Sequence, residues 1–310
     1  MNSYFVKREV CPACRSNSFK KRFSVKFDDP GIRTFLDNLY NPQGGVEYEY
    51  LEGAEYSLVE CNNCKLVFQE YIGNDELMML IYEKWIDPEM VKKNSVTAYT
   101  VDYYKKYSAE IINIIAYLNK LPSDLKFFDF GMGWGKWCLM AKAFGVEAFG
   151  AELSPERIAY ARSNGIKVLE WKEFPDYQFD FINTEQVFEH IPEPLNTMKY
   201  LSKSLKPGGI IKISVPNGNG IERILKSVNW TAKRKALDSL MVVSPLEHIN
   251  CYRTESVLKM GELCGLENVK PSKDYIGFRS LKDLAKTSLR APYYKYFKTG
   301  DFAYYFRKPA

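Results

Sequence analysis

Three alternate glycines and one glutamate are the residues of this 310-residue chain whose types and spacing best fit a chemical task. Gly131, Gly133 and Gly135 follow an apolar run, and Glu152 follows the next apolar run. A glycine turn lets the backbone touch a ligand that a Cβ would block, and a carboxylate after the next strand can accept both hydroxyls of a ribose. The pattern predicts a site for a nucleoside-containing cofactor.

Two side chains in this turn disfavour a dinucleotide. Lys136 stands where the third glycine of a G-x-G-x-x-G fingerprint would stand, and Trp134 lies where a pyrophosphate needs close backbone approach. A cofactor without phosphates tolerates both. S-adenosylmethionine is such a cofactor, with its methionine part over the glycines and its ribose at Glu152.

Four of the seven cysteines form two Cys-x-x-Cys pairs, the spacing of ligand pairs in structural zinc sites. The pairs are Cys11 with Cys14 and Cys61 with Cys64, and the long gap between them adds only logarithmically to the entropy of loop closure. Four thiolates leave no open position on Zn²⁺, so we expect a structural role. A redox pair or buried core cysteines are the alternatives.

The elements that must position these residues alternate along the chain. We expect helices at about 135–144, 155–163, 194–205 and 254–264. The strand candidates are 126–130, 146–151, 166–169, 179–183, 209–215, 266–271 and 301–307. This alternation predicts an α/β fold, a doubly wound and mostly parallel seven-stranded sheet with helices on both faces.

Three regions follow from this pattern. Residues 1–75, with both cysteine pairs, are expected to form a small zinc-ribbon-like domain. Residues 76–122 are expected to be a helical linker that caps the cofactor, and residues 123–310 the α/β domain. A polar and basic segment at about 217–247 interrupts the alternation and is predicted to be a lid insertion.

The composition, with 46% hydrophobic and 26% charged residues, is ordinary for a soluble globular protein. No apolar run approaches the roughly 20 residues of a membrane span, and the N-terminus lacks a signal core, so we expect a cytoplasmic protein. Residues 270–310 carry ten Lys or Arg against three Asp. They form either a solvated face or a contact for an anionic substrate, and no nucleic-acid-binding module accompanies them.

Four motifs, in order, resemble the core of the class I S-adenosylmethionine-dependent methyltransferases. They are the run from Asp129 to Gly135, Glu152, the run from Phe179 to Pro194 with its Glu-His-Ile-Pro, and Leu205-Lys-Pro-Gly-Gly. The resemblance implies a Rossmann-like methyltransferase fold and S-adenosylmethionine as cofactor. In addition, the run from Cys64 to Phe68 resembles the second knuckle of zinc ribbons fused to sugar and surface-glycan methyltransferases.

The same resemblance implies a set of cofactor contacts. The methionine part is expected near Gly131, Gly133, Thr184 and Glu185. The adenine is expected near Leu153 and the end of the third strand, around Glu170 and Trp171. Asp129, Gly135 and Glu152 complete the set.

The two histidines of the chain, His190 and His248, fall in loops expected at the carboxyl ends of strands. Histidine is the side chain best suited to remove a proton near neutral pH, so both are candidate catalytic bases for a hydroxyl acceptor. The alternative for each is a structural role in its loop. Tyr82, Trp85, Tyr103 and Tyr104 either cap the cofactor or bound sugar rings, or pack the helical linker.

The resemblance, the aromatic content of 15% and the basic C-terminal region favour O-methylation of a sugar, nucleotide sugar or glycan. A small aromatic or quinone-like metabolite, a carbon or nitrogen nucleophile, or RNA is the alternative acceptor. A catalytically inert, zinc-bearing binding module is the alternative from another class, and the presence of Gly131, Gly133 and Glu152 argues against it. The sequence indicates no oligomeric state.

Overall fold

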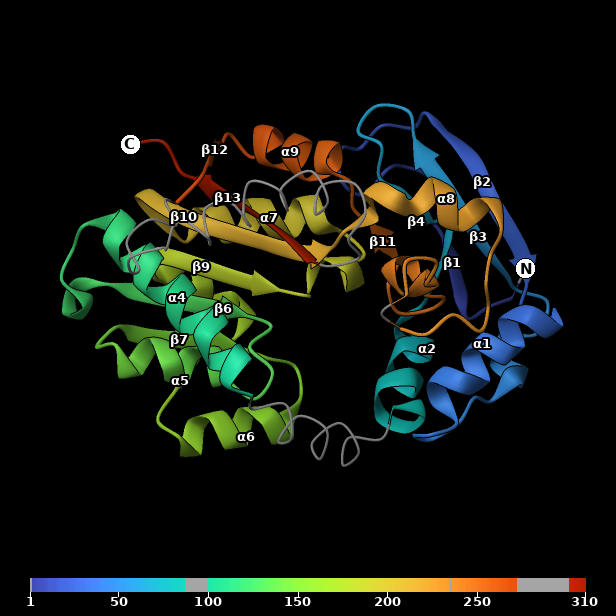
Figure 1. Cartoon of the computed structure of the whole chain (residues 1–310), viewed down its shortest axis with the longest axis horizontal. Helices are drawn as coiled ribbons and strands as arrows, with labels where there is room; N and C mark the ends of the chain where they lie inside the picture. Colours follow the sequence, from blue (N-terminus) through green and yellow to red (C-terminus); the bar gives the residue numbers. More distant parts are fainter. Residues whose placement is uncertain (1, 87–99, 235, 272–300) are drawn as a thin grey trace, which may run out of the picture.

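The computed structural model describes residues 2–86, 100–234, 236–271 and 301–310. These residues form two lobes that lie side by side (Figure 1). The basic stretch that begins at residue 270 falls mostly on residues 272–300, and part of the predicted linker falls on 87–99; both lie outside the described residues. Among the described residues, no helix has the length and apolarity to cross a membrane.

A seven-stranded sheet forms the core of the larger lobe, in the order β12-β13-β10-β9-β6-β7-β8. Its strands are β6 (Lys126–Phe130), β7 (Glu147–Ala151), β8 (Lys167–Val168), β9 (Phe179–Glu185), β10 (Leu205–Pro216), β12 (Glu267–Val269) and β13 (Asp301–Arg307). All neighbours are parallel except those of β13, which runs antiparallel between β10 and β12. The predicted mostly parallel seven-stranded sheet is confirmed.

Helices cover both faces of this sheet because its strands are apolar on both faces. Phe127 belongs to the hydrophobic cluster with α4 (Val101–Leu118), α5 (Lys136–Ala143) and α6 (Pro155–Ser163). Its neighbour Phe128 belongs to the cluster with α7 (Pro194–Lys203) and α9 (Thr254–Leu263). Successive side chains of a strand point to opposite faces, so one continuous apolar run serves two helical layers.

Local signals set several of these boundaries. Helix α6 has the predicted bounds, since Ser154 caps it by accepting a hydrogen bond from the Arg157 backbone N–H at 3.5 Å and Pro155 suits its first turn. Strand β10 begins earlier than predicted, at Leu205. Gly208, with φ of +77°, lies in the irregularity between Leu205 and Ile210 that lets the chain join β9 twice.

The smaller lobe is built on a four-stranded sheet in the order β11-β4-β3-β2. Its strands are β2 (Phe19–Lys26), β3 (Glu55–Cys61), β4 (Val67–Gln69) and β11 (Asn250–Cys251), and β1 (Phe5–Lys7) pairs separately with β5 (Tyr71–Gly73). Its helices are α1 (Pro30–Tyr40), α2 (Asp75–Leu80), α8 (Ile221–Lys226) and the π-helical η2 (Ile81–Trp85). Short 3₁₀ turns across the two lobes are η1 (Tyr48–Leu51), η3 (Pro122–Asp124), η4 (Trp171–Asp176), η5 (Phe188–His190), η6 (Gly218–Gly220) and η7 (Leu240–Val243).

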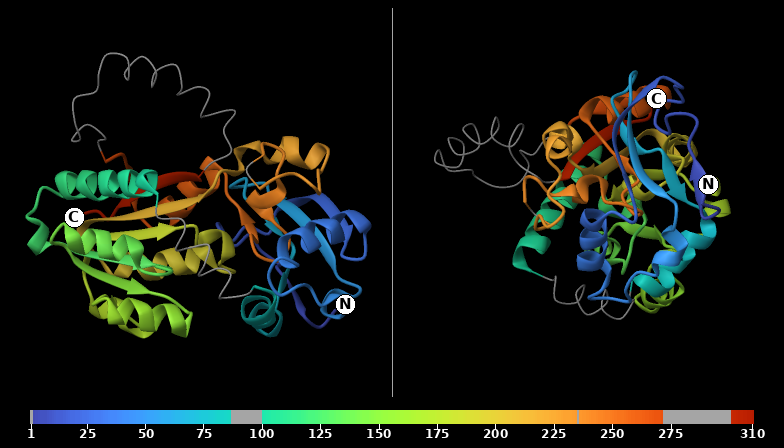
Figure 2. Two further views of the ribbon diagram at one scale, coloured as in Figure 1. Left: turned by 60° about the horizontal axis from the view of Figure 1, so that its bottom comes forward. Right: turned by 90° about the vertical axis from the view of Figure 1, so that its right-hand side faces the viewer.

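The segment predicted as a lid insertion packs into this smaller lobe. Ile221, Ile224 and Leu240 are buried in one hydrophobic cluster with Ile32 and Leu36 of α1. Both views in Figure 2 keep this orange part of the chain beside the blue N-terminal strands. The smaller lobe thus combines residues from before and after the main sheet, and the domain boundaries at 75 and 122 stay a prediction.

Candidate functional site

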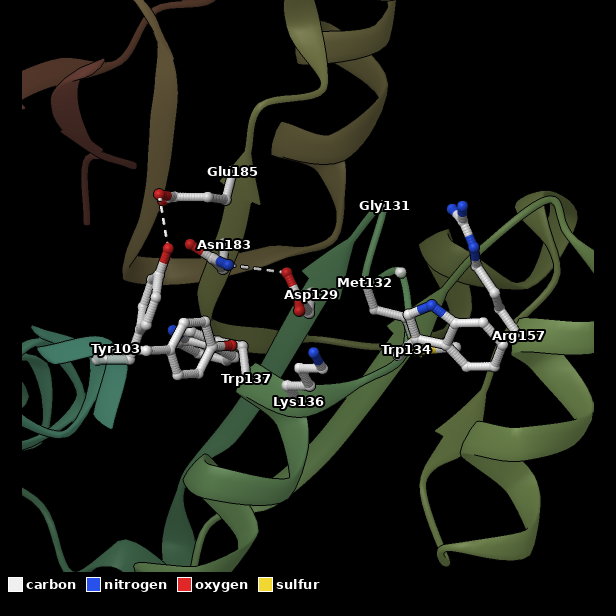
Figure 3. A pocket seen from close by; sticks show the side chains of 12 residues that line it. Tyr103, Asp129, Gly131, Met132, Trp134, Lys136, Trp137, Arg157, Asn183 and Glu185 are labelled. Atoms are coloured by element: carbon white, nitrogen blue, oxygen red, sulfur yellow. Dashed lines mark hydrogen bonds between the residues drawn. The ribbon is translucent and has the colours of Figure 1, made fainter. Parts of the chain in front are cut away.

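A cavity of about 270 Å³ lies at the carboxyl ends of β6 and β9. Asp129, Gly131, Gly133 and Glu185 line it, four residues of the set expected to hold the cofactor (Figure 3). Ligands of open α/β sheets bind at this edge, because the loops that follow parallel strands gather there. The cavity therefore lies where the sequence placed the cofactor.

The glycine turn needs glycine at each position, for different reasons. Gly131, Gly133 and Gly135 have φ of +77°, +54° and +70°, a region that favours glycine. A Cβ on Gly131 would lie 2.5 Å from Val187, whereas a Cβ on Gly135 would lie 2.4 Å from Ile166. Gly135 is thus required by the close packing of the start of α5 against Ile166, the residue before β8, and Gly131 by the close approach of the loop after β9.

Glu152 closes this turn. Its Oε2 accepts a hydrogen bond from the Gly133 backbone N–H at 2.9 Å, and its Oε1 accepts from Leu153 and Ser154 at 3.0 and 3.1 Å. The Arg157 guanidinium lies 3.6 Å away. The glycines and the acid, expected to meet at one crevice, are in direct contact.

Two polar residues inside the cavity are hydrogen-bonded to each other. The Asn183 amide donates to Asp129 Oδ1 at 2.8 Å. Burial raises the pKa of Asp129 to about 7, although the hydrogen bond from Asn183 and the charge of Lys212 act in the other direction. The Asp129 carboxyl therefore gains and loses its proton near neutral pH.

A buried cation fixes Glu185 at the cavity wall. Lys212 is 1% exposed, and its ammonium lies 2.5 Å from Glu185 and 2.9 Å from both oxygens of Glu110 on α4. Lys106 and Tyr107, also on α4, donate to Glu185 at 2.9 and 3.0 Å. Burial acts to raise the pKa of Glu185, but the two ammonium groups outweigh it and the pKa falls to about 2. Glu185 is thus an anion that ties α4 to the sheet.

The other residues of the predicted cofactor set, including Gly135 and Glu152, lie outside the cavity lining. Thr184 is buried between Asn183 and Glu185 on β9, and its hydroxyl donates to the Lys212 carbonyl at 2.8 Å. Leu153 is 95% exposed, and Trp171 is 49% exposed with its ring stacked 4.5 Å from that of Tyr200. Glu170 takes part in the capping of η4.

The two histidines do not line the cavity either, but their rings lie against each other. Their ring centroids are 4.7 Å apart, with an interplanar angle of 89°. His190 ends η5, and its Nδ1 lies 3.3 Å from the Tyr82 hydroxyl. His248 precedes β11, and its Nδ1 lies 2.5 Å from the Met241 carbonyl oxygen. A carbonyl only accepts, so Nδ1 of His248 carries the proton and Nε2 is the acceptor nitrogen.

Burial keeps both imidazoles neutral. It lowers the pKa of His190 to about 4, opposed by a hydrogen bond with the Glu247 backbone. It also lowers the pKa of His248 to about 3, and the neighbouring His190 adds to this effect. The Glu247 carboxylate accepts a hydrogen bond from the Tyr40 hydroxyl at 2.6 Å. A neutral imidazole can accept a proton at neutral pH without first losing one.

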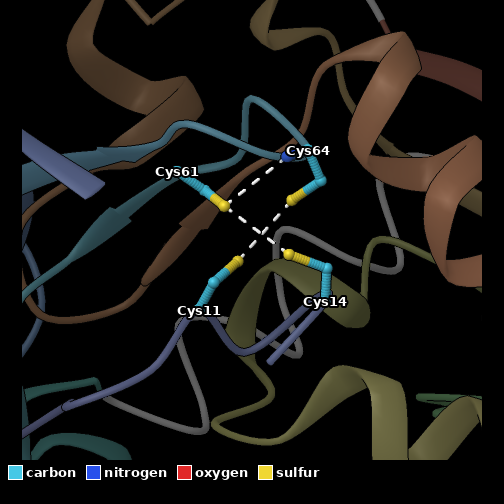
Figure 4. Close-up of side chains that lie close together, drawn as sticks. All are labelled: Cys11, Cys14, Cys61 and Cys64. Carbon is cyan, nitrogen blue, oxygen red and sulfur yellow. Dashed lines mark hydrogen bonds between the residues drawn. The ribbon is translucent and has the colours of Figure 1, made fainter. Parts of the chain in front are cut away.

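The four cysteines of the two pairs also converge (Figure 4). The Sγ atoms of Cys11 and Cys64 are 3.6 Å apart, those of Cys14 and Cys61 are 3.5 Å apart, and all four lie within 4.8 Å of one another. A tetrahedron with Zn–S bonds of about 2.3 Å has sulfur–sulfur distances of about 3.8 Å. The four thiols therefore fit Zn²⁺ with little rearrangement.

Comparison with protein families identifies the larger lobe. A family model described as a methyltransferase domain matches residues 103–270, more than half of the chain. The chain belongs to this methyltransferase family. The matched range includes the glycine turn, Glu152 and both histidines. Membership agrees with the observed sheet, and it confirms the predicted class I methyltransferase domain with S-adenosylmethionine as its cofactor.

The names of individual relatives of this methyltransferase indicate different methyl acceptors. A 164-residue stretch is 25% identical to a ubiquinone biosynthesis O-methyltransferase of Idiomarina loihiensis, covering 46% of this chain and 62% of that protein. A 108-residue stretch is 35% identical to phosphoethanolamine N-methyltransferase 1 of Zea mays, covering 31% and 21%. The solved structure of the plantazolicin methyltransferase in complex with SAH has 18% identity and a TM-score of 0.48, covering 75% and 94%. The matches thus span less than two thirds of these curated relatives.

The sequence did not single out several residues that the fold brings to the methyltransferase site. Asn183 and Tyr107 line the cavity, and Lys212 lies behind its wall. The alternation of β9 could have pointed to Asn183, because it shares a strand face with Glu185. Among the aromatic candidates, Tyr103 lines the cavity, Tyr82 contacts His190, Trp85 is buried against Tyr40, and Tyr104 is 48% exposed.

Proposed function

We propose that the protein transfers a methyl group from S-adenosylmethionine to a hydroxyl of a sugar, nucleotide sugar or glycan, with His248 as general base. The geometry of His248 carries this proposal. Its Nδ1 is held by the Met241 carbonyl, which leaves Nε2 as the nitrogen that can take a proton, and burial keeps the ring neutral. An amine with a free lone pair needs no such base, whereas a hydroxyl becomes a good nucleophile when its proton is removed.

The cofactor site of this proposal uses the predicted set with Asn183 added and with Gly135 and Thr184 left out, because Gly135 packs against Ile166 and the Thr184 hydroxyl is bonded to the Lys212 carbonyl. Asp129, Gly131, Gly133, Asn183 and Glu185 would hold the methionine part. Glu152 would hold the ribose. Leu153, Glu170 and Trp171 would lie against the adenine, as the family resemblance implies. When bound, S-adenosylmethionine supplies a methyl group activated by a sulfonium.

The chain's own part in the reaction is to position the hydroxyl and to take its proton. The loop after β9 links the two tasks, since Val187 lies beside Gly131 and His190 follows three residues later. In the proposed step the acceptor O–H bond would break as Nε2 of His248 gains the proton, and the oxygen would form its bond to the methyl carbon as the bond between that carbon and the sulfonium sulfur breaks, with the sulfur leaving as a neutral thioether. His190 packs edge-on against His248 and is the second candidate base.

The acceptor class rests on the resemblance to sugar and surface-glycan methyltransferases. A small aromatic or quinone-like acceptor is the second candidate, and the name of the Idiomarina relative favours it. Both candidates present a hydroxyl, so both are compatible with a general base.

We also propose that the four cysteines bind one structural Zn²⁺ and that the N-terminal residues form a separate unit around it. Cys11 and Cys64 are buried in one hydrophobic cluster with Phe188 and with Leu195 and Met198 of α7 in the larger lobe, so the metal would stiffen the contact between the lobes. Thiolate ligands need a reducing compartment, which supports a cytoplasmic location.

The decisive experiment is a methyl-transfer screen with labelled S-adenosylmethionine against nucleotide sugars, glycans, phenolic metabolites and amines. We expect a hydroxylated sugar acceptor, with turnover reduced about 10²–10⁴-fold in His248→Gln and cofactor affinity unchanged. Methylation confined to amines, or full turnover in His248→Gln, would refute the proposed base.

A further inference from the structure

A buried arginine of the smaller lobe makes hydrogen bonds in three directions. Arg8 is 7% exposed, and its Nε donates to the Gln69 carbonyl at 2.9 Å. Its Nη1 donates to Asn250 Oδ1 at 2.8 Å and its Nη2 to the Ile249 carbonyl at 2.7 Å. The guanidinium also lies 4.9 Å from the centre of the Phe68 ring. Burying a charge is costly. The number of directed contacts of Arg8 therefore indicates that this cation holds the groups around it in a specific arrangement.

Asn250 connects Arg8 to the loop that contains His190. Its side chain is fully buried, and its amide donates to the carbonyls of Phe188 and Ile191 at 3.2 and 2.7 Å. These two carbonyls bracket Glu189 and His190. Both amide hydrogens and the amide oxygen of Asn250 are therefore engaged, and an aspartate of the same shape could not donate either hydrogen bond.

Gln69 holds the other histidine loop. Its side-chain amide donates to the Ser244 and His248 carbonyls at 2.9 and 3.2 Å, and its backbone N–H donates to the Ile249 carbonyl at 3.0 Å. Gln69 is 2% exposed and ends β4, the strand that pairs with β11. The two histidine loops are thus fastened to two paired strands of the smaller lobe, the loop of His190 to β11 through Asn250 and the loop of His248 to β4 through Gln69.

We propose that Arg8, Gln69 and Asn250, the Arg8 network, are positioning residues that set His248 against His190. The smaller lobe would then position the two histidines without contacting the substrate. This inference rests on the proposed function, because the network acts through the proposed base. It explains why a charged side chain from residue 8 lies buried beside residues 249 and 250.

The test uses the full-length protein and the fact that it contains only two histidines. In protein labelled with ¹⁵N-histidine, long-range proton–nitrogen spectra report the tautomer and the titration of His190 and His248 alone. The variants are Asn250→Asp, which removes the two donated hydrogen bonds, and Arg8→Lys, which keeps the charge but loses the planar fork. Asn164→Asp makes the same chemical change at the exposed C-cap of α6.

We expect Asn250→Asp and Arg8→Lys to shift the ring resonances and pKa values of both histidines. Turnover should fall about 10–100-fold, the acid limb of the kcat/KM profile should move, and S-adenosylmethionine affinity should stay unchanged. Asn164→Asp should behave as wild type.

Two results would overturn the proposal: histidine spectra and pH profiles that match wild type in both variants, or a loss of turnover fully accounted for by unfolded protein. If Asn250→Asp does not fold, Arg8→Lys decides alone. Shifted histidine spectra together with an active His248→Gln enzyme would uphold the positioning role and refute only the proposed base.

Discussion

His190 and His248 lie edge to face, 4.7 Å between ring centroids, although His190 follows β9 of the main sheet and His248 precedes β11 of the smaller sheet. Each histidine has its own fixed partner, the Tyr82 hydroxyl for His190 and the Met241 carbonyl for His248. The pair exists only because β11 adds to the N-terminal sheet while η5 follows β9 of the main sheet. A contact between the two lobes thus creates the site to which we assign proton transfer.

Stability should decrease on acidification because of these histidines. An unfolded histidine has a pKa near 6.5, and the folded values of about 4 and about 3 are lower. Between pH 6.5 and about 4 the unfolded chain therefore binds more protons, so the free energy of unfolding falls as pH falls. Each histidine contributes at most about 1.4 kcal/mol per pH unit, and its contribution is complete above pH 6.5.

Urea unfolding at pH 7, 6 and 5 checks this prediction by comparing wild type with the double variant His190→Gln/His248→Gln. The raised pKa of Asp129 acts in the opposite direction in both proteins, so the difference between them is the quantity to measure. Equal pH slopes for the two proteins would contradict the prediction.

Replacing Glu152 by Gln should weaken cofactor binding about 10–100-fold. The substitution removes the charged acceptor that we assign to the ribose hydroxyls and that also holds the glycine turn, and hydrogen bonds to a charged group contribute about 1.5–3 kcal/mol. Calorimetric titration with S-adenosylmethionine measures the change. Glu156→Gln, at an exposed position of the same helix start, is the matched control. Equal affinity of both variants for S-adenosylmethionine would show that Glu152 does not contribute to cofactor binding.

Lys212→Met should destabilise the fold by about 3–5 kcal/mol. The lysine is 1% exposed, and its removal leaves the Glu110 and Glu185 carboxylates close together without the cation between them. Denaturant unfolding gives the free energy, with Lys105→Met on the exposed side of α4 as control. A loss no larger than that of the control would mean that the buried ion pairs contribute little.

Metal removal should loosen the contact between the lobes. We expect one zinc per chain by elemental analysis, none in the double variant Cys61→Ser/Cys64→Ser, and a lower melting temperature in that variant. Cys264→Ser, outside the cluster, should retain the metal. A metal-free wild-type preparation with the same melting temperature as the zinc-loaded protein would argue against the site.

Much of the larger lobe could be predicted because its signals are local. The strand at 126–130, the helix at 155–163 and the strand at 301–307 have the predicted bounds, since apolar runs, an N-cap serine and an N1 proline act within a few residues. The position of the 217–247 segment could not be predicted in this way. Its apolar residues find their partners in α1, nearly 200 positions earlier in the chain, and no local pattern reports such a contact.

The sequence by itself determined the methyltransferase core, the glycine turn with Glu152, and the two cysteine pairs, because fixed spacing between neighbouring elements encodes each of them. Only the tertiary structure decided that His190 meets His248, that Arg8 supports their loops, and that Asn183 rather than the Thr184 side chain faces the cavity. These relationships depend on strand pairing between segments more than 180 residues apart and on which face a side chain takes. Burial and long-range hydrogen bonds set both, and they arise only when the two lobes pack together.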